Sequence, residues 1–230
     1  MASGLRAAHR AALDIDESTR SAQMEFSETI TSLEQFREVM EPPSHFVTDK
    51  EVSSLDQHCR GFIARSPFLL IASTDGNGRI DISPKGDAPG FVQVLDDTTL
   101  AIPDRKGNHR TDTFLNLLEH PWVGLIFLVP GHRNTLRLRG RAEIVRDREI
   151  REAMAVDGQA PELAIGVHLT TGYFHCAKCV IRSNLWEGTS EPAPEDRRLL
   201  AETMVKYADL DVSVDDVQTI IEADEAERLY

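Results

Sequence analysis

The stretch NTLRLRGRAEIVR, residues 134–146, alternates small or apolar side chains with charged ones at every second position. Successive side chains of a β-strand point to opposite faces of its sheet, so this pattern predicts a strand with one buried face and one basic face. The buried set is Leu136, Leu138, Gly140, Ala142 and Ile144, and the charged set is Arg137, Arg139, Arg141 and Glu143.

Further strand patterns lie on both sides of this stretch. Residues 68–75 and 79–86 flank Gly76-Asn77-Gly78, and residues 91–95 and 98–103 flank Asp96-Asp97, so two hairpins are predicted. The apolar run at 122–129 and the segment 162–169 are predicted as two more strands. Many short strands with few helices between them predict a mainly β (α+β) fold, an antiparallel barrel or sandwich with flanking helices.

The helices are predicted from capping signals and helical spacing. Ser32 with Gln35 and Thr48 with Glu51 match capping boxes, which predicts helices over 33–40 and from Thr48 to the residues before Pro67. Shorter helices are expected at 111–119, 147–156 and 214–229. The resulting division is an N-terminal arm at 1–30, a central domain at 31–187 and an acidic, partly helical tail at 188–230.

Charge is unevenly distributed along the 230-residue chain, whose formal net charge is −13. Residues 79–148 hold 11 Lys and Arg against 9 Asp and Glu, whereas the rest holds 14 against 29. This acidic remainder argues against a nucleic-acid-binding protein. The chain has no apolar run of about 18 residues, no signal-peptide pattern and three cysteines, so we expect a soluble cytoplasmic protein without membrane partners.

The best candidate for a ligand site from composition alone is AIPDRKGNHRTD, residues 101–112. Arg105, Lys106, Asn108 and Arg110 fall between a predicted strand and a predicted helix, where side chains and free backbone N–H groups can converge on an anion such as a phosphate. Lys85 ends the hairpin strand expected beside residues 98–103. Taken alone, the loop is also consistent with a solvated surface segment.

Several motifs in a fixed order carry a family resemblance. SPKGD (83–87), IPDRKGN (102–108), TLRLRGRAEIV (135–145) and HCAK with RSNLW (175–186) resemble the pyridoxamine 5'-phosphate oxidase-related flavoproteins, in particular a bacterial FMN-dependent subfamily. The resemblance covers about residues 32–187. It implies a six-stranded antiparallel split β-barrel, a homodimer, and one FMN at each of two subunit interfaces.

The resemblance also implies which residues contact the flavin. A cation near the flavin N1 and C2 oxygen would stabilise the anionic reduced form, and Lys178, Arg182 and Arg137 are the candidates. By position in the motifs, the flavin would be lined by Asp81, Ile82, Ser83, Pro84 and Lys85, and its isoalloxazine and ribityl would lie against Ile102 and Pro103. The phosphate would be covered by Arg105, Lys106, Asn108 and Arg110. Thr135 would take the place of a flavin-contacting amide, and the partner subunit would contribute Lys178, Arg182 and Trp186.

One departure from the oxidases narrows the expected activity. Where they carry an Arg- and His-bearing motif that holds pyridoxal phosphate, this chain reads IRSNLWEG (181–188), which argues against vitamin B6 oxidation. We therefore expect an FMN-dependent oxidoreductase that exchanges a hydride between the flavin and a small molecule.

Two alternatives remain open. The first is a reductase that uses the deazaflavin F420, whose longer acidic tail would bind Arg137, Arg139 and Arg141. The second is a non-catalytic flavin- or haem-binding stress protein with His175 or His109 as a haem ligand.

Cys176 and Cys179 form a CxxC motif beside His175, the pattern of a redox pair or of half a metal site. No second ligand pair has suitable spacing, and a strand would point the two cysteines to opposite faces. We therefore predict structural or flavin-proximal thiols and no metal site.

Overall fold

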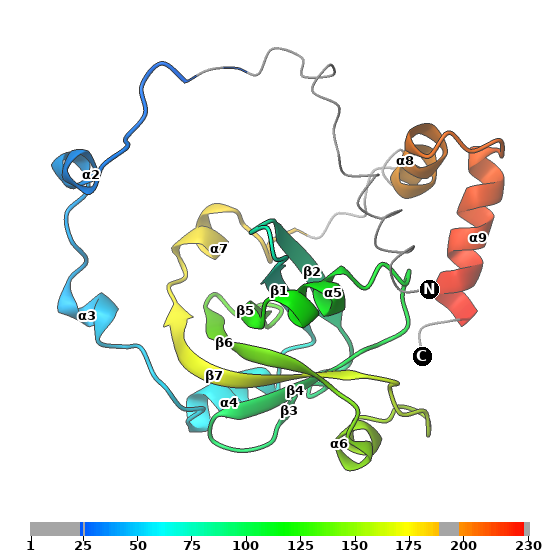
Figure 1. Cartoon of the computed structure of the whole chain (residues 1–230), viewed down its shortest axis with the longest axis horizontal. Helices are drawn as coiled ribbons and strands as arrows, with labels where there is room; N and C mark the ends of the chain where they lie inside the picture. Colours follow the sequence, from blue (N-terminus) through cyan, green and yellow to red (C-terminus); the bar gives the residue numbers. More distant parts are fainter. Residues whose placement is uncertain (1–23, 25, 189–197, 228–230) are drawn as a thin grey trace. The chain divides into compact units, whose positions relative to one another are not determined.

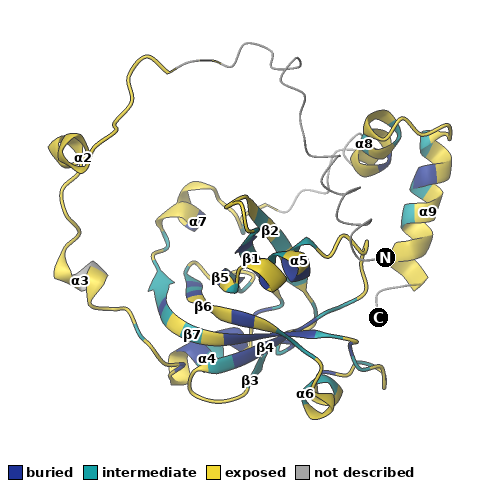
Figure 2. Cartoon of the chain, in the orientation of Figure 1, coloured by how far each residue is buried: buried dark blue, intermediate teal, exposed yellow. Residues whose placement is uncertain are grey.

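The computed structural model describes residue 24, residues 26–188 and residues 198–227, and the chain divides into two units, residues 1–47 and 48–230. Helix α2 (Leu33–Val39) belongs to the first unit. Its predicted capping signal is confirmed, because the Gln35 backbone N–H donates to Ser32 Oγ at 3.2 Å. Every residue of α2 is exposed (Figure 2). Of the predicted arm and tail, residues 1–23, 25, 189–197 and 228–230 lie outside the described residues.

Seven strands form one antiparallel sheet in the order β2, β1, β5, β6, β7, β4, β3 (Figure 1). The predicted antiparallel, mainly β architecture is therefore confirmed. The first predicted hairpin also forms, with the Asp75 N–H donating to the Arg79 carbonyl at 3.0 Å. The strands are β1 (Phe68–Thr74), β2 (Ile80–Gly86), β3 (Gln93–Val94), β4 (Thr99–Pro103), β5 (Trp122–Leu128), β6 (Thr135–Val145) and β7 (Ala164–His175).

The sheet differs from a six-stranded barrel in strand number and in closure. The seventh strand is β3, which adds two residues beside β4 at one edge. Within the described residues, β2 and β3 each pair with a single strand, so the sheet has two ends and is open.

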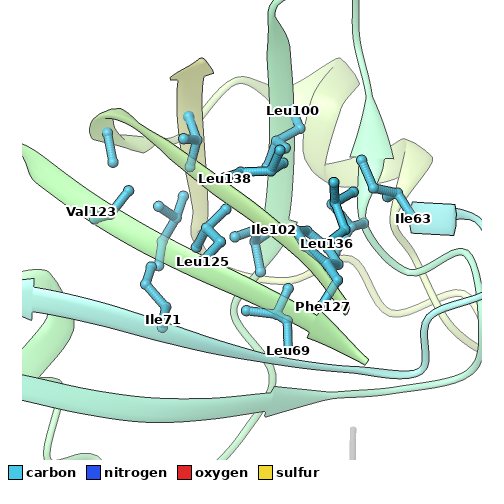
Figure 3. Close-up of a cluster of buried hydrophobic side chains, with 14 of the residues drawn as sticks. Ile63, Leu69, Ile71, Leu100, Ile102, Val123, Leu125, Phe127, Leu136 and Leu138 are labelled. Atoms are coloured by element: carbon cyan, nitrogen blue, oxygen red, sulfur yellow. The ribbon is translucent and has the colours of Figure 1, made fainter. Parts of the chain in front are cut away.

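The core lies on one face of this sheet. Leu69 on β1, Leu125 on β5 and Ile102 on β4 belong to one buried cluster and are at most 1% exposed (Figure 3). Since three strands separate β1 from β4 in the sheet order, their side chains can share a core only if the sheet curls around it. The alternation predicted for residues 134–146 is confirmed, with Leu136 and Leu138 facing this core.

Glycine permits the closest approach between β6 and β7. A Cβ atom at Gly140 would lie 2.3 Å from the carbonyl oxygen of His168, far inside van der Waals contact. The register of the two strands shifts between Arg139 and Gly140. A side chain at this position would therefore push the strands apart.

The helix predicted from Thr48 is wrong in its start. Helix α3 (His45–Thr48) ends at Thr48, and Val52 instead forms a backbone bridge with Gly172 of β7, with N–H to O distances of 2.8 Å in both directions. Helix α4 (Gln57–Ile63) begins after Asp56, whose carboxylate accepts from the backbone N–H groups of His58 and Cys59. Pairing with β7 thus extends the chain where the sequence pattern predicted helix.

Two of the remaining helices lie between strands along the chain, and the other three follow the last strand. They are α5 (Asp112–Glu119), α6 (Arg148–Ala153), α7 (Lys178–Arg182), α8 (Leu199–Tyr207) and α9 (Val214–Glu227). Helix α5 packs on β1, where Asn116 Nδ2 donates to Ser73 Oγ at 2.9 Å. Helices α8 and α9 pack against each other, and each buries one residue, Ala201 and Val217. No described helix has both the length and the apolar character needed to cross a bilayer.

Candidate ligand-binding cleft

A cleft of about 840 Å³ opens between the edge strand β2 and the loop that follows β4. The register explains its lining: Ser83 and Lys85 of β2 lie opposite Ile71 and Leu69 of β1 and so share the core-facing side of the sheet. Because β2 is an end strand, this side is left open there. The cleft is lined by residues 81–85 of β2, residues 104–111 after β4, residues 112–114 of α5 and residues 159–163 before β7.

The structure brings together the two stretches that the sequence singled out for a ligand. The residues that line the cleft include Asp81, Ile82, Ser83, Pro84 and Lys85 from the first stretch and Arg105, Lys106, Asn108 and Arg110 from the second. Cations separated by about twenty residues in sequence therefore face one cavity.

Other residues of the predicted site lie elsewhere. Ile102 is fully buried in the core and Pro103 is also buried, and neither lines the cleft. Thr135 starts β6, opposite His175. The remaining three follow β7: Lys178 and Arg182 are exposed on α7, and Trp186 donates its indole N–H to the His132 carbonyl at 2.8 Å.

Arg105 is fixed by a carboxylate that the sequence reasoning did not assign a role. Its Nε lies 2.5 Å from Asp87 Oδ2, and the Asp87 side chain is only 2% exposed. The backbone N–H of Asp87 in turn donates to the Pro67 carbonyl at 3.0 Å. Asp87 is the last residue of the SPKGD motif, two residues after Lys85, and this position in the motif is the feature of the sequence from which its role could have been inferred. The pair holds the Arg105 guanidinium in one position at the cleft wall.

The tip of the loop is held by exposed contacts. Arg110 Nε lies 2.9 Å from Asp112 Oδ2, and the Arg110 side chain is 69% exposed. Its backbone N–H donates to Asn108 Oδ1 at 3.1 Å. Two residues here, His109 and Thr111, have positive φ angles of 57° and 56°. A β-branched residue rarely adopts this conformation, so Thr111 is a strained position at the entrance to α5.

Lys85 and Asp104 are two of the half-buried charges of the cleft. Among the described residues neither side chain has a hydrogen-bonding or ion-pairing partner. Burial raises the pKa of the Asp104 carboxyl, and the positive charges of Lys85 and His109 oppose that rise. The Asp104 backbone N–H donates to the Leu163 carbonyl at 3.0 Å, which ties the loop to the segment before β7. The sequence analysis assigned the phosphate to Arg105, Lys106, Asn108 and Arg110 and gave Asp104 no role.

A second, smaller hollow of about 170 Å³ lies on the opposite face of the sheet. Gly124 and Ala72 leave space there, and Arg137 and Arg139 line it, which confirms the predicted basic face of β6. Arg137 also lies 5.4 Å from the ring centre of Tyr173. Ile82 lines both the hollow and the cleft.

The CxxC segment is not a strand. Strand β7 ends at His175, and α7 starts at Lys178, so the chain between Cys176 and Cys179 turns into a helix. Both thiols are free and exposed. The strand argument that pointed them to opposite faces is therefore wrong.

Comparison with known proteins gives one family. The model of the family described as pyridoxamine 5'-phosphate oxidase matches residues 55–176. No curated protein matches the chain.

Solved structures resemble the chain at low identity. The HupZ protein of Group A Streptococcus has 17% identity and a TM-score of 0.45, with 53% of this chain and 94% of that chain covered. A pyridoxamine 5'-phosphate oxidase-related, FMN binding protein of Nostoc punctiforme has 12% identity and a TM-score of 0.41, with 54% and 84% covered. General Stress Protein 26 of Bacillus anthracis has 11% identity and a TM-score of 0.40, with 57% and 94% covered.

Proposed function

We propose that this chain, which belongs to the pyridoxamine 5'-phosphate oxidase family, binds FMN in the cleft beside β2 and acts as a flavin-dependent oxidoreductase on a small molecule. The observation that carries the proposal is Lys85. Its side chain is half-buried at the cleft without a hydrogen-bonding or ion-pairing partner among the described residues. A half-buried cation loses part of its hydration, and a phosphate would give Lys85 the direct contact that Asp104, which interacts with it only through charge, does not make.

The other cleft residues fit a phosphomonoester on a planar ring system. A volume of about 840 Å³ falls in the usual range of ligand pockets, roughly 300–1,000 Å³. Arg105 is already oriented by Asp87, so it loses little freedom when it binds an anion. The N-cap residue Thr111 makes no side-chain hydrogen bond to the first turn of α5, whose residues 112–114 line the cleft and could offer backbone N–H donors.

The roles of the chain's residues follow from this placement. Bound FMN would supply the chemistry of hydride transfer. Lys85 and Arg105 would hold its phosphate, and Lys106, Asn108 and Arg110 would close over it. Asp81, Ile82, Ser83 and Pro84 would lie along the ring system.

A homodimer would complete the site. Lys178, Arg182 and Trp186 do not line the cleft of their own chain, and in this proposal a second copy brings its own set to it. Lys178, Arg182 or Arg137 would then place a positive charge near the flavin N1. Ile102 and Pro103, which are buried and do not line the cleft of their own chain, would support the flavin site from the core.

A reductase that uses F420 is the second candidate, and one observation favours it. The outer hollow with Arg137 and Arg139 shares Ile82 with the cleft, so a ligand with a long acidic tail has cations available beyond the cleft.

The test starts with the visible absorption spectrum of the freshly purified protein and chromatography of the ligand released by heat. FMN and F420 are then titrated into the ligand-free protein. Lys85→Met should weaken FMN binding about 10- to 100-fold, since one charge-assisted hydrogen bond contributes roughly 1.5–3 kcal/mol. Arg139→Met is the matched control, because Arg139 lies at the outer hollow.

The two candidates differ in the outcome of this titration. FMN binding that depends on Lys85 and is insensitive to Arg139 supports the first. Preference for F420, with a large loss in Arg139→Met, supports the second. A colourless protein that binds neither cofactor contradicts both.

A further inference from the structure

The backbone of Asp104 is held at the wall of the cleft. It directly follows β4, and its backbone N–H is held by the Leu163 carbonyl at 3.0 Å. The side chain is half-buried, lines the cleft, and has no hydrogen-bonding or ion-pairing partner among the described residues. A carboxylate in this setting lacks both full hydration and a direct counter-ion.

The charged groups around Asp104 show which of them can stabilise its negative charge. The nearby Arg105 and Arg110 are engaged by Asp87 and Asp112, at 2.5 and 2.9 Å. Lys85 and His109 are the groups whose positive charge favours the ionised form of Asp104. The charged and titratable groups that face the cleft with it are Asp81 and Lys85 on β2, Arg105, Lys106, His109 and Arg110 in the loop, Asp112 on α5 and Glu162 before β7.

A phosphate entering the cleft would change this balance. It would use the positive charge of Lys85, which is the charge that stabilises ionised Asp104. It would also bring negative charge close to a half-buried carboxylate, which favours the neutral acid. A carboxyl that keeps its proton becomes a hydrogen-bond donor to a phosphate oxygen.

We propose that the cleft binds a phosphomonoester together with one proton, and that Asp104 is the residue that holds this proton. This proposal rests on the proposed function, because it takes the ligand of the cleft to be a phosphate ester such as FMN. The proton comes from solvent or buffer and adds to an Asp104 carboxylate oxygen as the ligand binds. No other bond forms or breaks.

Asp104 is then a specificity-determining residue. It rejects a dianionic ligand that arrives without a proton and accepts the same ligand once the carboxyl is neutral. Burial already raises the pKa of Asp104, so the proton is taken up at a higher pH than an exposed aspartate would allow. By linkage, wild-type binding should weaken as the pH rises above the pKa of Asp104 in the free protein.

The test compares FMN binding across pH 4.5–8.5 in the wild type and in Asp104→Asn. The phosphate of FMN itself titrates near pH 6 and interacts with Asp104 in the wild type alone, so the two profiles are compared above pH 7, where the free ligand is a dianion in both titrations. The Kd of the wild type divided by the Kd of Asp104→Asn should rise with pH by up to about tenfold per pH unit, the limit for one coupled proton. Glu162→Gln removes an exposed carboxylate from the same cleft and should keep the wild-type profile. His109→Gln identifies any contribution from histidine.

Calorimetry of the wild type gives a second readout that needs no variant. Titrations of FMN at one pH, in buffers of different ionisation enthalpy, should show proton uptake on binding, and the uptake should fall in Asp104→Asn. Parallel pH profiles, or equal proton uptake in both proteins, would overturn the proposal while leaving FMN binding intact. Failure of the wild type to bind FMN at any pH would instead overturn the proposed function, and this proposal with it.

Discussion

The core strands and the cationic loop position their side chains by different means. In β5 and β6, Leu125, Phe127 and Leu136 are at most 1% exposed and are fixed by packing. In the loop, the side chains are fixed by charge, and the two ion pairs differ: Arg105 is 16% exposed against a buried Asp87, whereas Arg110 is 69% exposed. The base of the loop is therefore held by a mostly buried ion pair, and the tip by an ion pair whose guanidinium is screened by solvent.

Removing the buried pair at the base should have the largest effect. Arg105→Ala leaves the Asp87 carboxylate buried without its guanidinium, and loss of one partner of a buried pair lowers the free energy of unfolding by roughly 3–5 kcal/mol. Urea denaturation followed by circular dichroism measures the change. Arg110→Ala is the matched control at the tip and should cost at most about 1 kcal/mol, because exposed pairs contribute little.

The double variant Asp87→Asn/Arg105→Ala sharpens this result. It removes the negative charge of Asp87 together with the guanidinium, so it should recover part of the loss seen in Arg105→Ala. Equal losses in Arg105→Ala and Arg110→Ala would show that the base and the tip of the loop are not held differently.

The second-largest effect should come from a substitution between strands β6 and β7, where added side-chain volume rather than charge lowers the free energy of unfolding. Gly140→Ala would place a Cβ 2.3 Å from the His168 carbonyl oxygen, and the strands would have to separate. We expect a loss of about 2–3 kcal/mol in the free energy of unfolding, the upper range for overpacking. Gly124→Ala on the neighbouring β5 is the control, since a Cβ there meets no atom within 4 Å. Similar losses in both would contradict the close packing of β6 and β7.

The N-cap of helix α4 should make a contribution to the free energy of unfolding that depends on pH. Asp56 caps this helix, and the backbone N–H of Cys59 is the main cause that lowers the pKa of its carboxyl. Asp56→Ala should reduce the free energy of unfolding by about 1 kcal/mol at pH 7. A lowered pKa stabilises the fold above the unfolded value near 3.8 and less as the pH falls through the folded value, so the difference should shrink in acid.

The control for this cap is Asp56→Asn, which retains an N-capping side chain without the titratable group. It should keep most of the stability at pH 7 and lose the acid dependence relative to the wild type. A difference between wild type and Asp56→Ala that stays constant from pH 7 to pH 2 would exclude the carboxylate as its source.

The difference between strands fixed by packing and a loop fixed by ion pairs also explains which features could be predicted from the sequence. Period-two patterns predicted the strands and the buried face of β6, because packing repeats along a strand. The cations of the cleft were found from composition and resemblance. Asp87 and Asp104 were missed, because their roles depend on which segments meet in space. The false helix start at Thr48 has the same origin, since the bridge from Val52 to Gly172 joins residues far apart in sequence.

The smallest predicted effect concerns backbone strain at the loop tip. Thr111 holds a φ of 56° and its side chain makes no capping hydrogen bond to α5. Glycine adopts this conformation without steric cost, although it is more flexible in the unfolded chain. Thr111→Gly should therefore raise the free energy of unfolding by roughly 0.5–1 kcal/mol, from the relief of left-handed strain. The measurement is the urea midpoint, with Thr113→Gly, inside α5, as a control that should destabilise. Destabilisation by Thr111→Gly would mean that the tip is held by the threonine side chain, and the contrast between base and tip would lose its support.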